Sequence, residues 1–401
     1  MKILLFGDER GLPVLLQKIP FENISGIVCA SIRPQHIKLI ESLAEKHYHP
    51  FLIQPKPKDK GYSNFVKAIL EMRPDLIWVY SYSMILQDDV LLIPKMGAIN
   101  IHGALLPKYR GANPTQWAIL KGEFETGSTL HLMSSGIDEG PVIDQIRIPL
   151  FFEDTWKDVF LRNENAAQLL ISRNLTKILE GSWVAHAQNE SEVGFCRRRT
   201  KADGLFSWSQ ATYRIYNLIR ALVNPLPGAF YINSFGAPVI IDEYLPIKEI
   251  IKRKYGSIGN QEFFYSGIVL APMQEEISVL NFSKVVLQND VISFEIKCKK
   301  DDCLIGFFCL TNFNWHSRHA YLQIDIGTVE ENLFKNSLEA LCHLALTELN
   351  INKVSVYLSV KDTRLISLFN KNGFSTLGLQ NKGLYVNNEW INACHMNLII
   401  E

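Results

Sequence analysis

Cysteine is sparse in this chain, with seven residues in 401, and no two of them form a CxxC pair. An odd, scattered set of this kind is not typical of a disulfide framework or of a zinc site. We therefore expect free thiols in a reducing cytoplasm and no bound metal.

The chain also lacks an excess of either charge. Lys and Arg total 41, Asp and Glu total 41, and the formal net charge is zero. Proteins that bind polyanions usually carry a basic excess, so the composition argues against a nucleic-acid-binding protein. The two dense basic runs, RRRTK (197–201) and KRK (252–254), are short, and we expect them to be solvated surface.

Long apolar runs are missing as well. No window of about twenty apolar residues occurs, so we expect no membrane span. The first residues, MKILLFGDERGLPVLL, are not typical of a signal peptide, because GDER breaks the apolar run at once. The hydrophobic fraction of 47% is nevertheless ample for the cores of two or three domains. We expect a cytoplasmic protein.

Short apolar runs alternate with segments of helical spacing in the first part of the chain. The strand-like runs are KILLF (2–6), ISGIVCA (24–30), DLIWVYSY (75–82) and GAINIHGA (97–104). This alternation predicts a mostly parallel α/β sheet with a ligand cleft beyond the carboxyl ends of its strands. The FGDERG turn lacks the spacing of GxGxxG, so we predict an ordinary strand-to-helix turn and no bound NAD.

The remaining sequence predicts two further units. Residues 196–255 contain one helix (about 210–223), ended by NPLPG, and two strands, which indicate a small mixed α/β appendage. The polar segment 252–262 is the best candidate for a linker. Residues 263–401 contain three consecutive strands, a long helix with leucines at helical spacing, and further strands, which indicate an α+β domain. The first domain would then span residues 1–195.

Asn100 and His102 stand two residues apart at the end of a predicted strand, so both side chains lie on one face. Alone, such a pair more often satisfies backbone groups of loops. Asp138 changes the balance, because it lies in the glycine-flanked turn SSGIDEGPVIDQ. A carboxylate beside an imidazole orients it and raises its pKa. An amide, an imidazole and a carboxylate together suit acyl transfer to an amine.

The segment 100–145, NIHGALLPKYRGANPTQWAILKGEFETGSTLHLMSSGIDEGPVIDQ, resembles the core of the formyltransferases that use 10-formyltetrahydrofolate. That family includes methionyl-tRNA formyltransferase and the sugar-nucleotide N-formyltransferases. The resemblance extends over residues 1–250 and implies a Rossmann-like domain. It implies that His102 acts as the base on the amine, that Asn100 stabilises the oxyanion, and that Asp138 positions His102.

The resemblance also implies a folate pocket, lined largely by backbone. Its predicted residues are Ser83, Met84 and Ile85 on one side and Gly136 and Ile137 on the other. The alternative for SMILQDD (83–89) is a plain helix start.

Tyr109 and Arg110 are candidates for substrate binding, because a guanidinium binds a carboxylate or phosphate by bidentate contacts. The equal alternative is that Arg110 braces its own loop. His131 and Trp117 are expected to be structural.

The acceptor is expected to be a nucleotide-linked amino sugar. LLPKYRG and KGEFETG resemble the sugar-nucleotide enzymes, and a tRNA would require an extended basic surface. The best candidate is UDP-4-amino-4,6-dideoxy-N-acetyl-altrosamine, of the pseudaminic acid pathway. The alternatives are dTDP-4-amino-4,6-dideoxyglucose and methionyl-tRNA.

The segment KVSVYLSVKDTRLISLFNKNGFSTLG (353–378) resembles the C-terminal half of GNAT acetyltransferases. Their pyrophosphate-binding, Gly-rich turn is absent, and the matching segment (324–336) places Glu330 and Glu331 where phosphates would lie. Two carboxylates would repel a pyrophosphate. We predict a GNAT-like domain that has lost acetyl transfer, and that holds a sugar or nucleotide or mediates homodimer contacts. A bifunctional formyl/acetyltransferase is the alternative.

Overall fold

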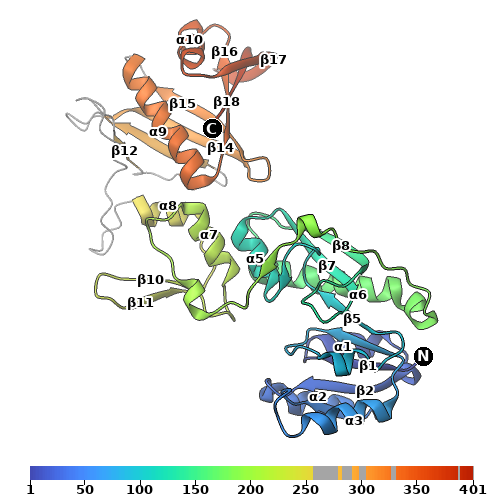
Figure 1. Cartoon of the computed structure of the whole chain (residues 1–401). Helices are drawn as coiled ribbons and strands as arrows, with labels where there is room; N and C mark the ends of the chain where they lie inside the picture. The colour runs from blue at the N-terminus through green and yellow to red at the C-terminus, as the bar shows by residue number, and fades with distance from the viewer. Residues whose placement is uncertain (256–278, 282–290, 298–303, 327–330, 387–388, 401) are drawn as a thin grey trace. The chain divides into compact units, whose positions relative to one another are not determined.

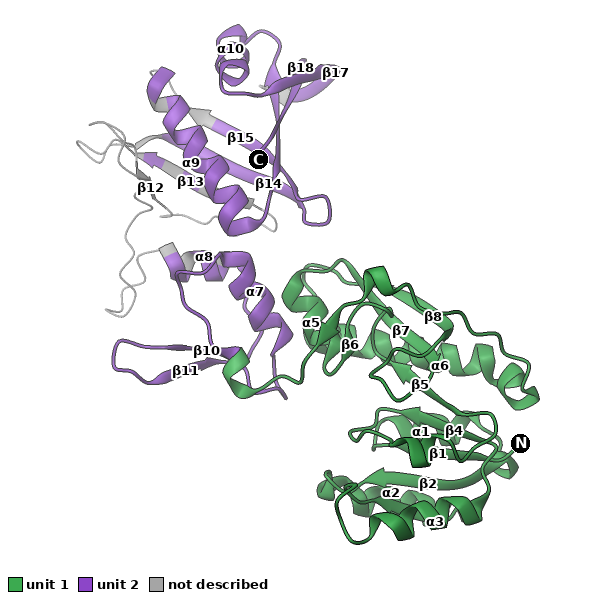
Figure 2. Cartoon of the chain, viewed as in Figure 1, with its two compact units in different colours: residues 1–203 green, residues 204–401 purple. Residues whose placement is uncertain are grey.

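The structure, a computed structural model, describes residues 1–255, 279–281, 291–297, 304–326, 331–386 and 389–400. The chain divides into two compact units, residues 1–203 and 204–401 (Figure 2). The division falls close to the boundary predicted at 195/196. Most of the predicted linker lies outside the described residues, and its first part, 252–255, belongs to a helix.

The first unit is built on a seven-stranded sheet of order β3-β2-β1-β4-β5-β7-β8 (Figure 1). Its strands are β1 (Ile3–Gly7), β2 (Ile24–Ala30), β3 (Phe51–Gln54), β4 (Leu76–Tyr80), β5 (Ala98–His102), β7 (Glu125–Leu132) and β8 (Val142–Pro149). The first five are parallel, and β7 and β8 are antiparallel to their neighbours. The predicted mostly parallel α/β sheet is confirmed.

Helices cover both faces of this sheet. Residues from α1 (Gly11–Lys18), α2 (Pro34–Lys46) and α6 (Trp156–Glu180) share one buried cluster with the strands. Residues from α3 (Tyr62–Met72) and α4 (Asp88–Leu91) share the other. Strand β1 shows why two layers form: Ile3 and Leu5 enter the first cluster and Leu4 and Phe6 the second, as the period-2 geometry of a strand requires.

The long helix α6 has clear local signals at both ends. Thr155 and Asp158 form a capping box at its start, and Gly181 ends it with a φ of 71°. Eight of its residues are buried, so one stripe packs on the sheet and another carries polar side chains toward solvent or the site.

A short strand pair completes the first unit. Strand β6 (Arg110–Gly111) pairs in parallel with β9 (Phe195–Cys196), which holds the last part of the unit against the loop after β5. Helix α5 (Pro114–Lys121) follows β6, and 3₁₀ turns occur at η1 (Phe21–Asn23), η2 (Glu190–Glu192) and η3 (Lys201–Gly204). Residues more than eighty positions apart thus meet at the carboxyl edge of the sheet.

The second unit begins with the predicted appendage. It contains α7 (Thr212–Ala221), the hairpin of β10 (Ala229–Ile232) and β11 (Pro238–Ile241), and α8 (Ile247–Tyr255). Glu348 of helix α9 (Glu331–Leu349) accepts hydrogen bonds from the Thr212 backbone N–H at 2.8 Å and its hydroxyl at 2.6 Å, and it pairs with Lys254. The appendage and the C-terminal sheet domain are therefore joined by partly buried polar contacts.

The C-terminal part is a second seven-stranded sheet, of order β12-β13-β14-β15-β16-β18-β17. The strands are β12 (Val279–Asn281), β13 (Val291–Lys297), β14 (Leu304–Asn314), β15 (His319–Ile326), β16 (Lys353–Ser359), β17 (Ser375–Val386) and β18 (Glu389–Ile399). Only β15 and β16 pair in parallel, joined by α9 (Glu331–Leu349), and α10 (Thr363–Lys371) joins β16 to β17. The expected C-terminal α+β domain is confirmed. Its resemblance to the acetyltransferases stays a prediction.

Candidate active site

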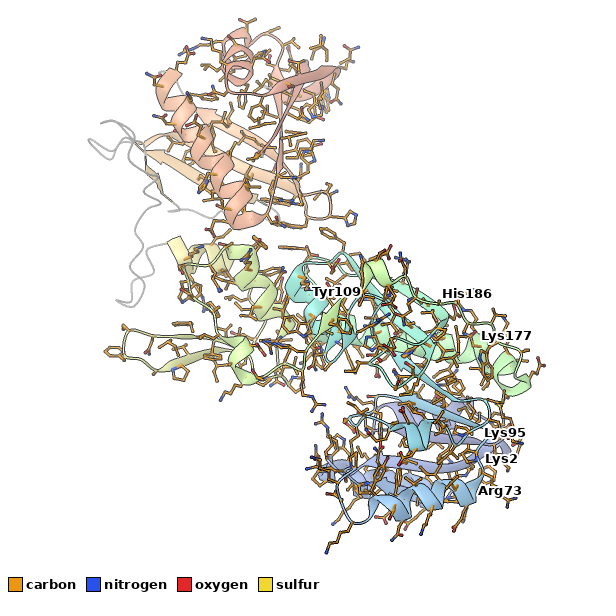
Figure 3. The ribbon with its side chains drawn as sticks, viewed as in Figure 1. Lys2, Arg73, Lys95, Tyr109, Lys177 and His186 are labelled. Carbon is orange, nitrogen blue, oxygen red and sulfur yellow. The ribbon has the colours of Figure 1, made fainter. Side chains whose placement is uncertain are left out.

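A cavity of about 530 Å³ opens at the carboxyl ends of the strands of the first unit. The residues after β1, β4 and β5 line it, together with the start of α5 and one face of α6. In Figure 3, Tyr109 lies on the other side of the unit from Lys2, which precedes β1, and from Arg73 and Lys95. The cavity therefore occupies the edge where α/β sheets generally bind ligands.

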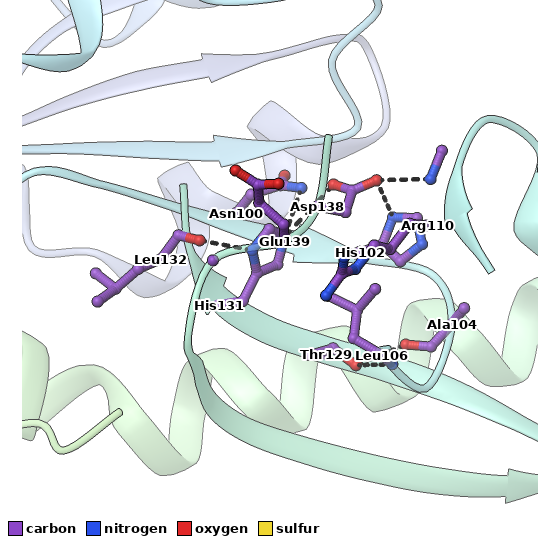
Figure 4. Close-up of polar contacts among 12 residues, drawn as sticks. Asn100, His102, Ala104, Leu106, Arg110, Thr129, His131, Leu132, Asp138 and Glu139 are labelled. Atoms are coloured by element: carbon purple, nitrogen blue, oxygen red, sulfur yellow. Dashed lines mark hydrogen bonds and ion pairs between the residues drawn. The ribbon is translucent and has the colours of Figure 1, made fainter. Parts of the chain in front are cut away.

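Asn100, His102 and Asp138 meet in this cavity, although 36 positions separate the last two in the sequence (Figure 4). His102 Nδ1 lies 3.4 Å from Asp138 Oδ2, and His131 Nε2 lies 3.6 Å from Asp138 Oδ1. The Gly111 backbone N–H donates to Asp138 Oδ2 at 2.9 Å. One carboxylate thus faces two imidazoles and one backbone donor.

The protonation of His102 follows from its second contact. Its Nε2 lies 2.8 Å from the carbonyl oxygen of Tyr109. A carbonyl oxygen only accepts, so Nε2 carries the hydrogen. In the neutral ring, the lone pair is then on Nδ1, which faces Asp138 and the cavity.

The surroundings keep His102 neutral and Asp138 ionised. Burial lowers the pKa of His102, and the nearby charge of Asp138 offsets this only in part. Burial alone would raise the pKa of Asp138, but His102, His131 and the Gly111 N–H together hold it below its usual range. The pair is therefore a neutral base next to an anion that stabilises its protonated form.

His131 fixes the orientation of Asn100. Its Nδ1 donates to the carbonyl oxygen of Leu132 at 2.7 Å, so in the neutral ring Nε2 carries the lone pair. Asn100 Nδ2 lies 3.3 Å from that nitrogen and donates to it. The second amide hydrogen of Asn100 stays available to a ligand oxygen in the cavity. His131 is 1% exposed, so it is structural as expected, and it supports two of the three predicted catalytic residues.

Three non-glycine residues around the cavity have left-handed backbone. They are Ser81, Asn113 and Asp138, with φ values of 54°, 60° and 52°. Such conformations cost free energy and concentrate at functional sites. At Asp138 the conformation turns the carboxylate back toward His102.

Of the residues predicted to bind folate, Ser83 lines the cavity and the others do not. The Ile85 and Ile137 side chains are exposed at 64% and 54%. Met84 accepts a weak contact from Ser31, and Ile85 offers its carbonyl oxygen to Gln54. The segment after β4 is irregular as far as Gln87, and the short helix α4 begins at Asp88, so residues 83–85 do not start a helix.

Tyr109 and Arg110 also lie outside the cavity lining. The Tyr109 hydroxyl donates to Glu123 at 2.6 Å. Arg110 is 3% exposed, and its guanidinium donates to Gln188 and Glu190 at 2.8 Å each. These contacts correspond to the alternative given above, in which Arg110 braces its loop.

Several cavity residues were not predicted. Asp8 accepts hydrogen bonds from Arg10 and from the Ser81 hydroxyl at 2.8 and 2.9 Å, and both partners line the cavity with it. Burial raises the pKa of Glu164, which also lines the cavity. Arg198 and Arg199 complete the charged lining. The GDERG turn at the end of β1 and the RRR run were the available signals.

The two imidazoles and the carboxylate do not form a metal site. Within the part of the chain that the structure describes, no group of three or more His, Cys, Asp or Glu side chains is placed to hold a metal ion. Among the helices of the described residues, none combines the length and apolarity needed to cross a membrane.

Residues 22–175 match the family model described as formyl transferase. This part of the chain carries a formyl transferase domain. The match includes Asn100, His102 and Asp138, so the predicted resemblance to formyltransferases is confirmed. The bifunctional polymyxin resistance protein ArnA of Wigglesworthia glossinidia brevipalpis is 30% identical over 308 residues, which are 72% of this chain and 47% of that protein. The chain thus spans about half the length of this curated relative.

Solved structures share the fold of the formyl transferase domain. A sugar N-formyltransferase from a Shewanella species superimposes with a TM-score of 0.52 at 21% identity, over 61% of this chain and 98% of its own. A 4-N formyltransferase from Francisella tularensis gives 0.50 at 18% identity, over 61% and 98%. These similarities support the fold of the formyl transferase domain.

Proposed function

We propose that this chain transfers a formyl group from 10-formyltetrahydrofolate to the amine of a nucleotide-linked 4-amino-4,6-dideoxy sugar. The observation that carries the proposal is the convergence of Asn100, His102 and Asp138 in one cavity of a formyl transferase domain. The sequence resemblance to sugar-nucleotide N-formyltransferases supports the choice of acceptor.

His102 serves as the base. The sugar amine attacks the formyl carbon of the folate, and His102 Nδ1 takes the proton that the nitrogen loses. Nδ1 is the available position because Nε2 donates to Tyr109. The imidazolium formed lies 3.4 Å from the Asp138 carboxylate, which stabilises it.

Asn100 stabilises the oxyanion. Attack on the formyl carbon produces a tetrahedral intermediate with a negatively charged oxygen, which needs a fixed donor. The free hydrogen of Asn100 Nδ2 serves this purpose, because His131 holds the amide in place. The bond between the formyl carbon and N10 then breaks, and N10 takes up a proton, which His102 can return.

The remaining predicted residues have less direct parts in the proposal. Ser83 lies where one side of the folate would enter, and Met84, Ile85, Gly136 and Ile137 are proposed to contact it through backbone and apolar atoms. Tyr109 contributes its carbonyl oxygen to His102. Arg110 supports the same loop.

The C-terminal domain is proposed to be GNAT-like and inactive in acetyl transfer. Residues 327–330, which include the expected phosphate turn and Glu330, lie outside the described residues. Glu331 is described and pairs with Lys371 at 2.7 Å. Calorimetry with acetyl-CoA tests this part: binding would favour the bifunctional alternative.

A substrate screen tests the proposal. The chain is incubated with 10-formyltetrahydrofolate and, separately, the UDP-linked altrosamine, dTDP-4-amino-4,6-dideoxyglucose and methionyl-tRNA. We expect formylation of the UDP sugar. Turnover of only the dTDP sugar would refute the pseudaminic acid assignment, and turnover of only methionyl-tRNA would refute the sugar acceptor.

A further inference from the structure

Arg199 is partly buried, and its guanidinium carbon lies 5.9 Å from the centre of the Trp117 ring. Its Nε and Nη1 atoms are buried and have no hydrogen-bond partner among the residues that the structure describes. Its Nη2 donates to the backbone carbonyl of Asp203 at 3.0 Å. The Asp203 carboxylate is engaged by Arg197 and Thr200 instead. An unsatisfied buried donor costs free energy, and a ligand oxygen would reach this guanidinium only through the part of Arg199 that lines the cavity.

Arg199 lines the same cavity as His102, and Arg198 lines it beside Arg199. Arg198 forms no ion pair with any described residue. The backbone N–H of Arg199 donates to Asn113 Oδ1 at 3.1 Å, which fixes this segment to the start of helix α5. Residues 113–116, at the amino end of that helix, also line the cavity. The helix dipole adds partial positive charge at this end.

The acidic residues of the cavity do not neutralise these arginines. Asp8 forms an ion pair with Arg10, Glu164 interacts electrostatically with Arg10, and Asp138 faces His102 and His131. Arg197 is also close to Arg199, and its positive charge repels the Arg199 guanidinium. Burial lowers the pKa of Arg199, and the nearby Asp203 offsets this only in part.

We propose that Arg199, together with Arg198, binds the diphosphate of the nucleotide-linked substrate and so orients the sugar amine toward His102. The identity of the substrate rests on the proposed function, but the anion site does not. Two arginines that line one cavity, together with a helix terminus, suit a group with two linked phosphates better than a single carboxylate. The glutamate tail of the folate is the other anionic group that could enter the cavity, and the experiment separates the two.

The direct test is calorimetry of the full chain with inorganic pyrophosphate, UDP and dTDP. We expect the wild type to bind all three, and Arg199→Gln and Arg198→Gln to bind each of them about tenfold more weakly or worse, since bonds to charged groups have this strength. Arg199→Lys should recover part of the affinity. Arg147→Gln is the matched control, because Arg147 is exposed and lies outside the cavity. Circular dichroism establishes that each variant is folded. If Arg199→Gln does not fold, Arg198→Gln still tests the anion site, because Arg198 is exposed and its replacement should not affect folding.

Steady-state kinetics separates the two anionic ligands. We expect Arg199→Gln to raise KM for the nucleotide sugar about tenfold or more and to lower kcat, because the amine is then less well oriented, with the KM for 10-formyltetrahydrofolate nearly unchanged. A rise in the folate KM alone would overturn the proposal, as would equal pyrophosphate affinity in wild type and variants. If pyrophosphate binding depends on Arg199 but no amino sugar is formylated, the anion site stands and the proposed function fails.

Discussion

The Nε2 nitrogen of His102 lies 2.8 Å from the carbonyl oxygen of Tyr109, and this contact decides which ring nitrogen can accept a proton. Because Nε2 is committed as a donor, Nδ1 is the basic atom, and it points toward Asp138. The base and its stabilising anion are therefore assembled before any substrate binds.

Replacement of His102 should remove the base without unfolding the domain. We expect His102→Ala to lower kcat by roughly 10²–10⁴-fold, the range typical of general base catalysis. His186→Ala is the control, since that side chain is exposed and only its backbone is paired. Formyl transfer is followed by mass spectrometry of the product. A His102→Ala enzyme with near-normal kcat would refute the assigned role.

Asp138→Asn should move the pH profile as well as the rate. Burial lowers the pKa of His102, and the charge of Asp138 raises it. The net result is a pKa below the ordinary value of 6.5. Activity needs neutral His102 and is lost as the pH falls through its pKa. Without the carboxylate, that pKa falls further, so the acid limb of kcat/KM should move to lower pH while its plateau drops. The pH profiles of the variant and the wild type are measured with the same substrate, so that protonation of the substrate amine affects both profiles equally. An unmoved or upward-shifted limb would contradict this coupling.

His131 should act through Asn100. His131→Phe keeps a ring in the buried site but removes the acceptor for Asn100 Nδ2. We expect kcat to fall roughly tenfold, the cost of losing a positioning hydrogen bond, with little change in KM. In a double-mutant cycle, the effects of His131→Phe and Asn100→Ala should be less than additive, and the remaining effect of His131→Phe reflects its contact with Asp138. Fully additive effects would mean that His131 supports the site by another route.

Replacement of Arg110 tests whether its guanidinium binds the substrate or braces its own loop. Its hydrogen bonds to Gln188 and Glu190 predict that Arg110→Ala costs roughly 1–3 kcal/mol of unfolding free energy, measured in urea. The KM for the nucleotide sugar should change much less than in Arg199→Gln. A large KM effect with unchanged stability would restore Arg110 as a substrate ligand.

Gly11 allows the turn after β1 to pack on β4. A Cβ atom there would lie 2.1 Å from the carbonyl oxygen of Tyr80, so Gly11→Ala should destabilise the protein by roughly 1–3 kcal/mol. Gly61→Ala is the matched control, because a Cβ at Gly61 meets no atom within 4 Å. Urea denaturation compares the two. Equal stability would mean that the turn relaxes without cost.

Much of the fold could be predicted from the sequence, because buried parallel strands form continuous apolar runs. The bounds of β2 coincide with the predicted run 24–30. Strand β3 was missed, since its four residues are only partly apolar and are followed by proline. The direction of β7 could not be foreseen, because the alternation of side chains in a strand does not encode the direction of its partner.

Only part of the candidate site could be predicted from the sequence. Asn100, His102 and Asp138 were found by their motif, and the cavity brings them together. Arg199 was expected on a solvated face, because three consecutive arginines carry no information about which one points inward. The pairing of β6 with β9, which carries the arginines to the cavity, depends on contacts more than eighty residues apart.

The most direct measurement is formyl transfer from 10-formyltetrahydrofolate to nucleotide-linked 4-amino sugars by the wild type and by Asn100→Ala, His102→Ala and Asp138→Ala. We predict formylation of the sugar amine by the wild type and a loss of at least about a hundredfold in each folded variant. Formyl transfer at the wild-type rate by these variants, or none by the wild type on any such sugar, would contradict the account.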